Sequence, residues 1–215
     1  TDTEPCGTQP ASLADPIIRK AMDYAMNRER FASIGYGGYA EPASSVVPPL
    51  HGDYHDASLK PTLYDPAMAN KLLDDAGYKD SNGDGVREWS DGSPLEYRMM
   101  SDQTPLYARF VQLAQEDLTA IGIKTNAELL ADPRGERGAP LWDFDLWFFS
   151  YGSDIDPDFP LITIRCGERI PWGWNYSGYC SEQGDKNYLA TVHAVDHAER
   201  VRAVYTAQDY IFNER

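Results

Sequence analysis

Three closely spaced carboxylates follow an aromatic, strand-like segment in the C-terminal half of the chain. The stretch 152–159 contains Asp154, Asp156 and Asp158. Ligand sites of α/β proteins lie at the carboxyl ends of strands. A carboxylate there can pair with a cationic ligand group through a charge-assisted hydrogen bond, and we assign this role to Asp154. Asp156 and Asp158 flank Pro157, and we interpret them as turn residues that accept hydrogen bonds from nearby backbone amides.

A stretch rich in aromatic residues lies between Cys166 and Cys180. Its candidate ligand-binding residues are Trp172, Trp174, Asn175 and Tyr176. The aromatic rings could stack on a ligand while the amide positions backbone polar groups, or the rings could form a small core beneath the loop. A disulfide closing a loop of this size would stabilise the fold by roughly 3 kcal/mol. The cysteine count leaves a disulfide and two reduced thiols equally open.

The segment 80–91 resembles a calcium-binding loop in its spacing, with side-chain oxygens at positions one, three and five and Gly85 at the tight turn. The expected ligands are Asp80, Asn82, Asp84, Val86 through its carbonyl, Glu88 and Asp91. The last of these is shorter than the usual bidentate Glu, and a strand follows where such a motif needs a helix. We therefore expect no required cofactor and at most a weak structural calcium. An acidic turn without an ion is the favoured alternative.

Other motifs carry weaker signals. His51, Asp53 and His55 would share one side of an extended segment, which could hold a transition metal, although such a pattern in a loop rich in Pro and Gly is a poor predictor. Gly38, in a Gly-Gly-Tyr turn, could let the backbone approach a ligand closely. The remaining histidines, His193 and His197, are interpreted as surface residues.

No catalytic motif with a nucleophile and a base is present, so we expect a binding protein and not an enzyme. A hydrolase that uses two carboxylates in one cleft is the enzymatic alternative.

The bulk composition narrows the class of protein. The chain has 215 residues, 42% of them hydrophobic, and a formal net charge of −15. That length allows one domain with a sizeable core, and the negative charge disfavours nucleic acid and anionic membrane surfaces as partners. No apolar run reaches about 18 residues, the length a membrane span needs. The first ten residues lack a signal-peptide pattern, so we expect any targeting segment to be removed or to lie outside this sequence.

The expected elements alternate between helix and strand. Hydrophobic periodicity and caps predict helices over 15–31, 64–76, 105–121 and 188–214, the last with a break near residue 196. Strands are predicted over 95–100, 123–130 and 144–151, the third buried in the sheet because it is so apolar. A long irregular segment, 35–61, separates the first two helices and is expected to wrap the surface. Strand, helix and strand in tandem indicate an α/β fold.

Several segments, in order, resemble one family. The run Asp15 to Glu29 is similar to the "D-x-x-v-R-x-A-l-x-Y-A-i-D-R-e" helix of the dipeptide- and oligopeptide-binding class of ABC-importer solute-binding proteins, and Tyr64 to Tyr78 is similar to its "Y-D-P-x-x-A-x-x-L-L-x-x-A-G-Y". Further matches lie at 84–92, 115–123, 143–146 and 156–158. Each motif is weak alone, but together they cover nearly the whole chain in the right order.

The resemblance implies an α/β lobe with a mixed sheet flanked by helices. Residues 1–215 would form one lobe of a two-lobed protein that closes on a small peptide or similar solute and delivers it to an ABC permease. It also implies a disulfide between Cys166 and Cys180, which leaves Cys6 without an evident partner. Where relatives place an Asp that holds the ligand ammonium, this chain has Ser153, followed by Asp154.

The same resemblance implies an extracellular or periplasmic monomer, either free or lipid-anchored. Two alternatives remain for the function. One is an oligosaccharide-binding member of the same class, and the other is a calcium-stabilised structural or interaction domain.

Overall fold

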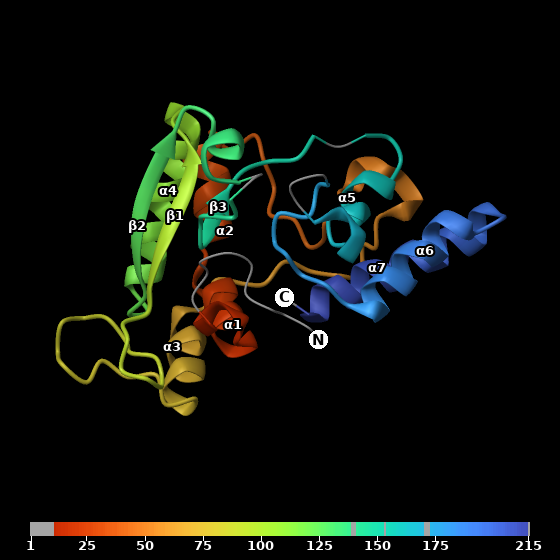
Figure 1. Ribbon diagram of the computed structural model, residues 1–215. Helices are drawn as coiled ribbons and strands as arrows, with labels where there is room; N and C mark the ends of the chain where they lie inside the picture. The colour runs from red at the N-terminus through yellow and green to blue at the C-terminus, as the bar shows by residue number, and fades with distance from the viewer. Residues whose placement is uncertain (1–10, 139–140, 153, 170–172, 215) are drawn as a thin grey trace.

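The computed structural model describes residues 11–138, 141–152, 154–169 and 173–214. A three-stranded sheet of order β2-β1-β3 organises one half of the fold (Figure 1). The strands are β1 (Glu96–Asp102), β2 (Lys124–Leu130) and β3 (Leu146–Phe148). Both pairings are parallel, so the described sheet is parallel where a mixed sheet was expected. The α/β class itself is confirmed.

Three helices contribute to the main apolar core beside this sheet. They are α1 (Pro16–Ala25), α3 (Pro66–Asp75) and α4 (Pro105–Thr119), and each begins with Pro at its first position. Helix α4 joins β1 to β2 as the crossover that a parallel pair requires. The core contains Ile18 of α1, Leu73 of α3, and Tyr97 and Met99 of β1, all at most 1% exposed.

The first helix ends earlier than its periodicity predicts. Helix α1 stops at Ala25, and the chain restarts as the short α2 (Arg28–Arg30) and a π-helical turn, η2 (Phe31–Gly35). The Asn27 side chain accepts a hydrogen bond from the Arg30 amide at 3.0 Å and so caps the new turn. The Asn27 amide donates to Asp117 of α4 at 2.9 Å. This tertiary bond draws the backbone out of the helix.

The third strand differs most from the expectation. Regular pairing covers only Leu146–Phe148, and these residues are half-buried, whereas a buried strand over 144–151 was predicted. Strand β3 lies at the edge of the described sheet, with a neighbouring strand, β1, on one side only. The residues after β3 leave the sheet, and Phe149 packs against Tyr176 in the loop that precedes residue 182.

A second half of the fold is helical and includes α5 (Asp158–Ile162), α6 (Glu182–His193) and α7 (His197–Glu214) (Figure 1). The break near residue 196 is confirmed, but α6 begins six residues before the predicted start because Ser181 caps it by accepting from the Gly184 amide. Short helical turns also form at η1 (Ala11–Ala14), η3 (Pro49–Tyr54), η4 (Arg134–Gly138) and η5 (Cys166–Glu168).

The long segment 36–61 wraps across to the helical half, as expected. The buried side chain of Gln208 on α7 holds it there, accepting from the Ser45 hydroxyl at 2.7 Å and donating to the Tyr54 carbonyl at 2.7 Å. Val47 packs beside it in a second apolar cluster with Leu161 and Val204. The wrap is therefore part of the core of the helical half.

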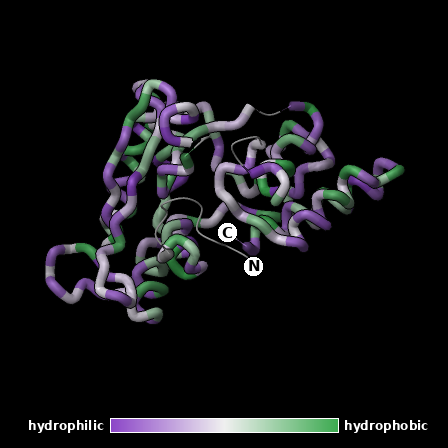
Figure 2. The backbone as a smooth tube through the Cα atoms, in the orientation of Figure 1, coloured by the Kyte–Doolittle hydropathy of each residue, from purple (hydrophilic) through white to green (hydrophobic). Residues whose placement is uncertain are grey.

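Two further features follow from the described residues. The loop between α3 and β1 projects from the fold, and Figure 2 shows hydrophilic residues at its outer turn. Among the helices described, none has the length and apolar character that a membrane span requires.

Candidate functional site

An aromatic cluster forms where β3 ends and the chain enters the loops of the helical half. Trp147 and Phe149 each meet Tyr176 edge-on, with ring centroids 4.8 and 5.4 Å apart. Phe159 of α5 meets Trp174 in the same way at 5.4 Å. Edge-to-face contacts of this kind fix the rings relative to one another. The carboxyl end of β3 therefore carries a rigid aromatic surface.

The loop that presents Trp174 and Tyr176 is closed by a disulfide. Cys166 and Cys180 are bonded, with their Cα atoms 4.6 Å apart, as the resemblance implied. Trp172 and Cys6 lie outside the described residues. Tyr151, which follows β3, donates a hydrogen bond to the Trp174 carbonyl and so ties the loop to the strand. Burial raises the pKa of the Tyr151 hydroxyl above its usual value, so it remains a hydrogen-bond donor at neutral pH.

Asn175 holds this loop from inside. The residue is fully buried, and its side-chain amide donates to the carbonyls of Arg165 at 2.9 Å and Tyr179 at 2.7 Å. Its side-chain oxygen accepts from the Ser177 hydroxyl at 2.9 Å. The side chain therefore positions the backbone, as one of the sequence interpretations has it, and does not face a ligand.

Asp154 and Trp174 border the same shallow depression. Its lining residues are Ser150, Tyr151, Gly152, Asp154, Phe159 and Trp174. Asp154 is exposed, and one of its oxygens accepts from the Ile155 amide at 2.7 Å. Trp174 is 39% exposed, whereas Tyr176 is only 6% exposed and lines a neighbouring apolar pocket that shares Tyr151. Ser153 lies outside the described residues.

The other two carboxylates of this segment are engaged with the protein. Burial and a hydrogen bond to Asp158 raise the pKa of Tyr188, and the other Asp158 oxygen is buried without a hydrogen-bond partner among the described residues, so Asp158 does not accept from backbone amides as predicted. Asp156 accepts from the Asp158 amide at 2.9 Å, as expected of a turn residue. It also forms a two-pronged ion pair with Arg200 of α7, both contacts at 2.7 Å, which the sequence did not indicate. The Arg200 guanidinium lowers the pKa of the Asp156 carboxyl. Of the three carboxylates, Asp154 is therefore the one that remains exposed at the rim of the depression.

Sequence reasoning missed one residue at this site. Arg134, in the η4 turn, places its guanidinium carbon 4.9 Å from the ring centroid of Trp174 and 5.7 Å from that of Tyr176. The turn is seated against the sheet, since a Cβ at Gly138 would meet the Trp147 ring at 3.2 Å. Arg134 precedes Trp174 by forty residues, so no local pattern connects them. Only the tertiary structure brings them together.

Gly38 lies in an exposed turn with φ of +82°, a conformation that favours glycine. The adjacent Tyr36 meets Phe110 of α4 at 5.0 Å, and Tyr107 of that helix is hydrogen-bonded to Ser150 at 2.6 Å. The turn is thereby connected to the segment after β3 through the first turns of α4. Direct ligand contact at Gly38 stays a prediction.

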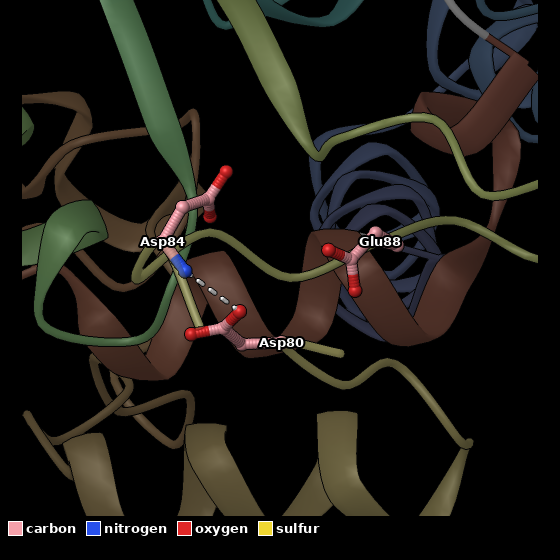
Figure 3. Close-up of side chains that lie close together, drawn as sticks. All are labelled: Asp80, Asp84 and Glu88. Atoms are coloured by element: carbon pink, nitrogen blue, oxygen red, sulfur yellow. Dashed lines mark hydrogen bonds between the residues drawn. The ribbon is translucent and has the colours of Figure 1, made fainter. Parts of the chain in front are cut away.

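The acidic loop brings together half of the expected calcium ligands. Oxygens of Asp80, Asp84 and Glu88 lie within 4.8 Å of one another (Figure 3). Asp80 accepts from the Gly83 and Gly85 amides at 2.7 and 2.9 Å, and these backbone bonds, that of Gly85 foremost, lower the pKa of its carboxyl.

The remaining expected ligands are arranged differently. Asn82 donates from its side chain to Asp84 at 3.1 Å, and the Val86 amide donates to Asp84 at 2.8 Å. Asp91 accepts from the Ser93 amide and hydroxyl in a separate turn and does not join the three carboxylates. Calcium binding here stays a prediction.

The three residues of the predicted histidine metal site do not converge in the structure. His51 is buried against the Pro48 carbonyl, and His55 is hydrogen-bonded to the Val47 carbonyl at 2.7 Å. Asp53 instead pairs with His197 at the start of α7. Across the residues that the structure describes, the acidic loop is the one place where three metal-ligating side chains converge.

Comparisons with known proteins agree with this architecture. Residues 7–170 match the family model described as "Bacterial extracellular solute-binding proteins, family 5 Middle". The glutathione-binding protein GsiB of Escherichia coli strain K12 is 30% identical over 212 residues, which is 93% of this chain and 38% of that relative.

Solved structures give the same fold. The oligopeptide-binding protein AppA of Bacillus subtilis, in complex with a nonapeptide, has a TM-score of 0.86 at 24% identity, over 97% of this chain and 42% of that one. A periplasmic oligopeptide-binding protein of Thermotoga maritima, bound to mannohexaose, has a TM-score of 0.83 at 21% identity, over 95% and 40%. The chain thus spans about two fifths of the length of these proteins. It belongs to the family 5 bacterial extracellular solute-binding proteins.

Proposed function

We propose that this chain is one lobe of a two-lobed protein that captures a short peptide and passes it to an ABC permease. Family membership supports a solute-binding role without catalysis, and two similar proteins bind peptides, glutathione in one case and a nonapeptide in the other. The observation that carries the proposal is the depression after β3, where the exposed Asp154 carboxylate borders the half-exposed ring of Trp174. A carboxylate beside an apolar ring suits the α-ammonium end of a peptide.

The residues of the site have separate roles in this proposal. Asp154 accepts from the ligand ammonium, and Trp174 packs on the adjoining side chain or peptide plane. Tyr176 packs on Trp147 and Phe149 and so anchors the loop that carries Trp174, and Asn175 with the disulfide fixes the same loop. Closure of a second lobe over the depression would remove it from water and strengthen the charged contact.

The proposal extends to the compartment in which the protein acts. We propose a monomer that acts in the extracellular or periplasmic space, free or held by a lipid anchor. The disulfide fits an oxidising compartment of this kind.

Calorimetry on the whole protein tests the ligand contact. A library of dipeptides to pentapeptides is titrated into wild type and the Asp154→Asn variant, and we expect the variant to lose about tenfold or more in affinity, 1.4 kcal/mol being tenfold. Asp75→Asn on α3, where the carboxylate is exposed and pairs with Lys71, is the matched control and should leave affinity unchanged. Equal binding by wild type and Asp154→Asn would remove the ammonium contact from the proposal.

A second candidate ligand is an oligosaccharide. The half-exposed indole of Trp174 offers a flat apolar face of the kind that sugars stack on, and one relative is bound to mannohexaose. Titration with cello-, xylo- and manno-oligosaccharides beside the peptides separates the two ligand classes. Sugar binding that Trp174→Ala abolishes, with peptides silent, would replace the peptide proposal with this one.

A further inference from the structure

Asn82 is followed by Gly83 in the loop that projects between α3 and β1 (Figure 1). It is the one asparagine of the sequence that a glycine follows, and both residues are exposed. In an Asn-Gly pair the backbone nitrogen of the glycine can attack the side-chain carbonyl of the asparagine, because glycine has no Cβ to hinder the approach. The surroundings of Gly83 are open, since a Cβ placed there would meet nothing beyond its chain neighbours within 4 Å.

The side-chain amide of Asn82 is held at both of its polar atoms by Asp84. The Asp84 amide donates to the Asn82 side-chain oxygen at 2.8 Å, and the Asn82 side-chain nitrogen donates to the Asp84 carboxylate at 3.1 Å. The first bond closes a ring that includes the peptide between Asn82 and Gly83, so it folds the side chain back over that peptide. The same bond stabilises the negative charge that develops on the side-chain oxygen during an attack.

The attacking nitrogen has a carboxylate beside it. The Gly83 amide donates to Asp80 at 2.7 Å, and a bond from the Gly85 amide to the other Asp80 oxygen at 2.9 Å fixes that carboxylate in place. Asp80 also accepts from the Asp84 amide at 3.2 Å (Figure 3). A carboxylate within hydrogen-bond reach of a proton can take it up as the nitrogen attacks. The loop therefore brings together a nucleophile, a base and an activated carbonyl.

Asn126 provides a comparison within the same chain. It is exposed on β2, and its side-chain nitrogen donates to the Glu96 carboxylate at 2.6 Å, so its amide is held much as that of Asn82 is. The backbone of Asn126, however, pairs with β1 in regular parallel register, and Ala127 follows it. In an extended strand the side chain stands away from the next backbone nitrogen.

We propose that Asn82 is a site of spontaneous deamidation, which the contacts with Asp80 and Asp84 promote. The Gly83 nitrogen forms a bond to Cγ of Asn82 and gives its proton to the Asp80 carboxylate. The bond from Cγ to Nδ2 breaks, and the leaving nitrogen takes up a proton and departs as ammonia. Solvent water then opens the cyclic imide at either carbonyl, which gives an aspartyl residue or an isoaspartyl residue with a longer backbone. The reaction needs no ligand, so it holds whichever solute the protein captures.

Peptide mapping by mass spectrometry on the whole protein, incubated in neutral and in mildly alkaline buffer, tests the site. We expect the peptide that carries Asn82 to change from amide to acid with time, in aspartyl and isoaspartyl forms, and faster at the higher pH, because the Gly83 nitrogen must lose its proton. Ion exchange should show one additional negative charge, and Asn126 should keep its amide over the same period. Isomerisation at the neighbouring Asp84-Gly85 pair changes neither mass nor charge, so it is not mistaken for this reaction.

Two variants test the contribution of the loop. Asn82→Gln keeps an amide but needs a larger ring for the attack, so it should abolish the charge change. Asp80→Asn keeps an oxygen that accepts from the Gly83 amide but removes the base, and should slow the reaction at Asn82 by at least about tenfold. An Asn82 amide that lasts as long as that of Asn126 would overturn the proposal. Deamidation of Asp80→Asn at the wild-type rate would also overturn it, because the reaction would then owe nothing to the contacts of this loop.

Discussion

At the scale of single residues, the site depends on side chains that hold the backbone as much as on those that face solvent. Asn175 shows this most clearly, since it lies beside Trp174 in sequence but is fully buried. Its two donated hydrogen bonds satisfy carbonyls at both ends of the disulfide loop. A buried carbonyl without a partner costs about 1–3 kcal/mol, so the loss of this amide affects the whole loop.

We therefore predict that Asn175→Ala lowers the free energy of unfolding by about 2 kcal/mol or more, because two carbonyls lose their donor. Thermal or denaturant unfolding of the variant measures this loss. Asn187→Ala on α6, where the side chain accepts only from Gln183, is the matched control and should change stability by less than about 0.5 kcal/mol. A variant as stable as wild type would show that the loop is held by the disulfide alone.

At the scale of elements, capping and tertiary hydrogen bonds decide where helices end. The positions of β1 and β2 and the start of α4 follow the sequence pattern, whereas α1 breaks where Asn27 bonds to Asp117. Burial raises the pKa of the Asp117 carboxyl, against the lowering effect of that bond. The acidic loop between α3 and β1 is another element whose backbone is set by its own side chains, through the amides that Asp80 accepts.

For this loop the two interpretations give different expectations: an ion-free acidic turn shows no response to calcium, whereas a weak calcium site at Asp80, Asp84 and Glu88 is stabilised by it. A ligand at about ten times its dissociation constant adds about 1.4 kcal/mol, which raises the melting temperature of a chain of this size by about 3–5 °C. Differential scanning fluorimetry with calcium, magnesium and a chelator measures the shift. Asp84→Asn should abolish it, and Asp91→Asn, in the neighbouring turn, should retain it. An equal response to magnesium, or none to calcium, would mark the loop as an acidic turn only.

At the scale of the whole molecule, two main apolar clusters, one in each half, are linked along the chain by the segment 36–61, and a smaller third cluster of Met100, Phe144 and Tyr176 lies where the halves meet. One lies among α1, α3, α4 and the sheet, and the other lies between α5, α6 and α7. Gln208 and Val47 attach the wrap to the helical half. The candidate site lies where β3 passes from one half to the other, and its outer side is open to solvent at Trp174.

From this we predict that residues 1–215, expressed alone, fold cooperatively but bind the peptide at least about tenfold more weakly than the whole protein, since a second lobe adds contacts only on closure. Circular dichroism on heating establishes the folded state of the lobe, and calorimetry compares the two affinities. Equal affinities would mean that this lobe holds the entire ligand site. Non-cooperative melting would contradict the claim that its two clusters suffice for folding.

The sequence alone determined the features that depend on neighbours along the chain. Hydrophobic periodicity and Pro-initiated caps located α3 and α4, the order of strand and helix indicated the α/β class, and the spaced motifs pointed to the solute-binding family. The Asp-Pro turn of Asp156 and the position of Asp154 at a strand end also follow from local chemistry.

The tertiary structure alone decided the features that depend on contacts between distant segments. Hydrophobic periodicity predicted too long a third strand, because a run of apolar residues does not show that the strand lies at the edge of the sheet. The contacts of Arg134 with Trp174, Arg200 with Asp156 and Gln208 with Ser45 join residues that no local pattern relates. Since the charges around a binding site come from several loops, their arrangement exists only once the chain has folded.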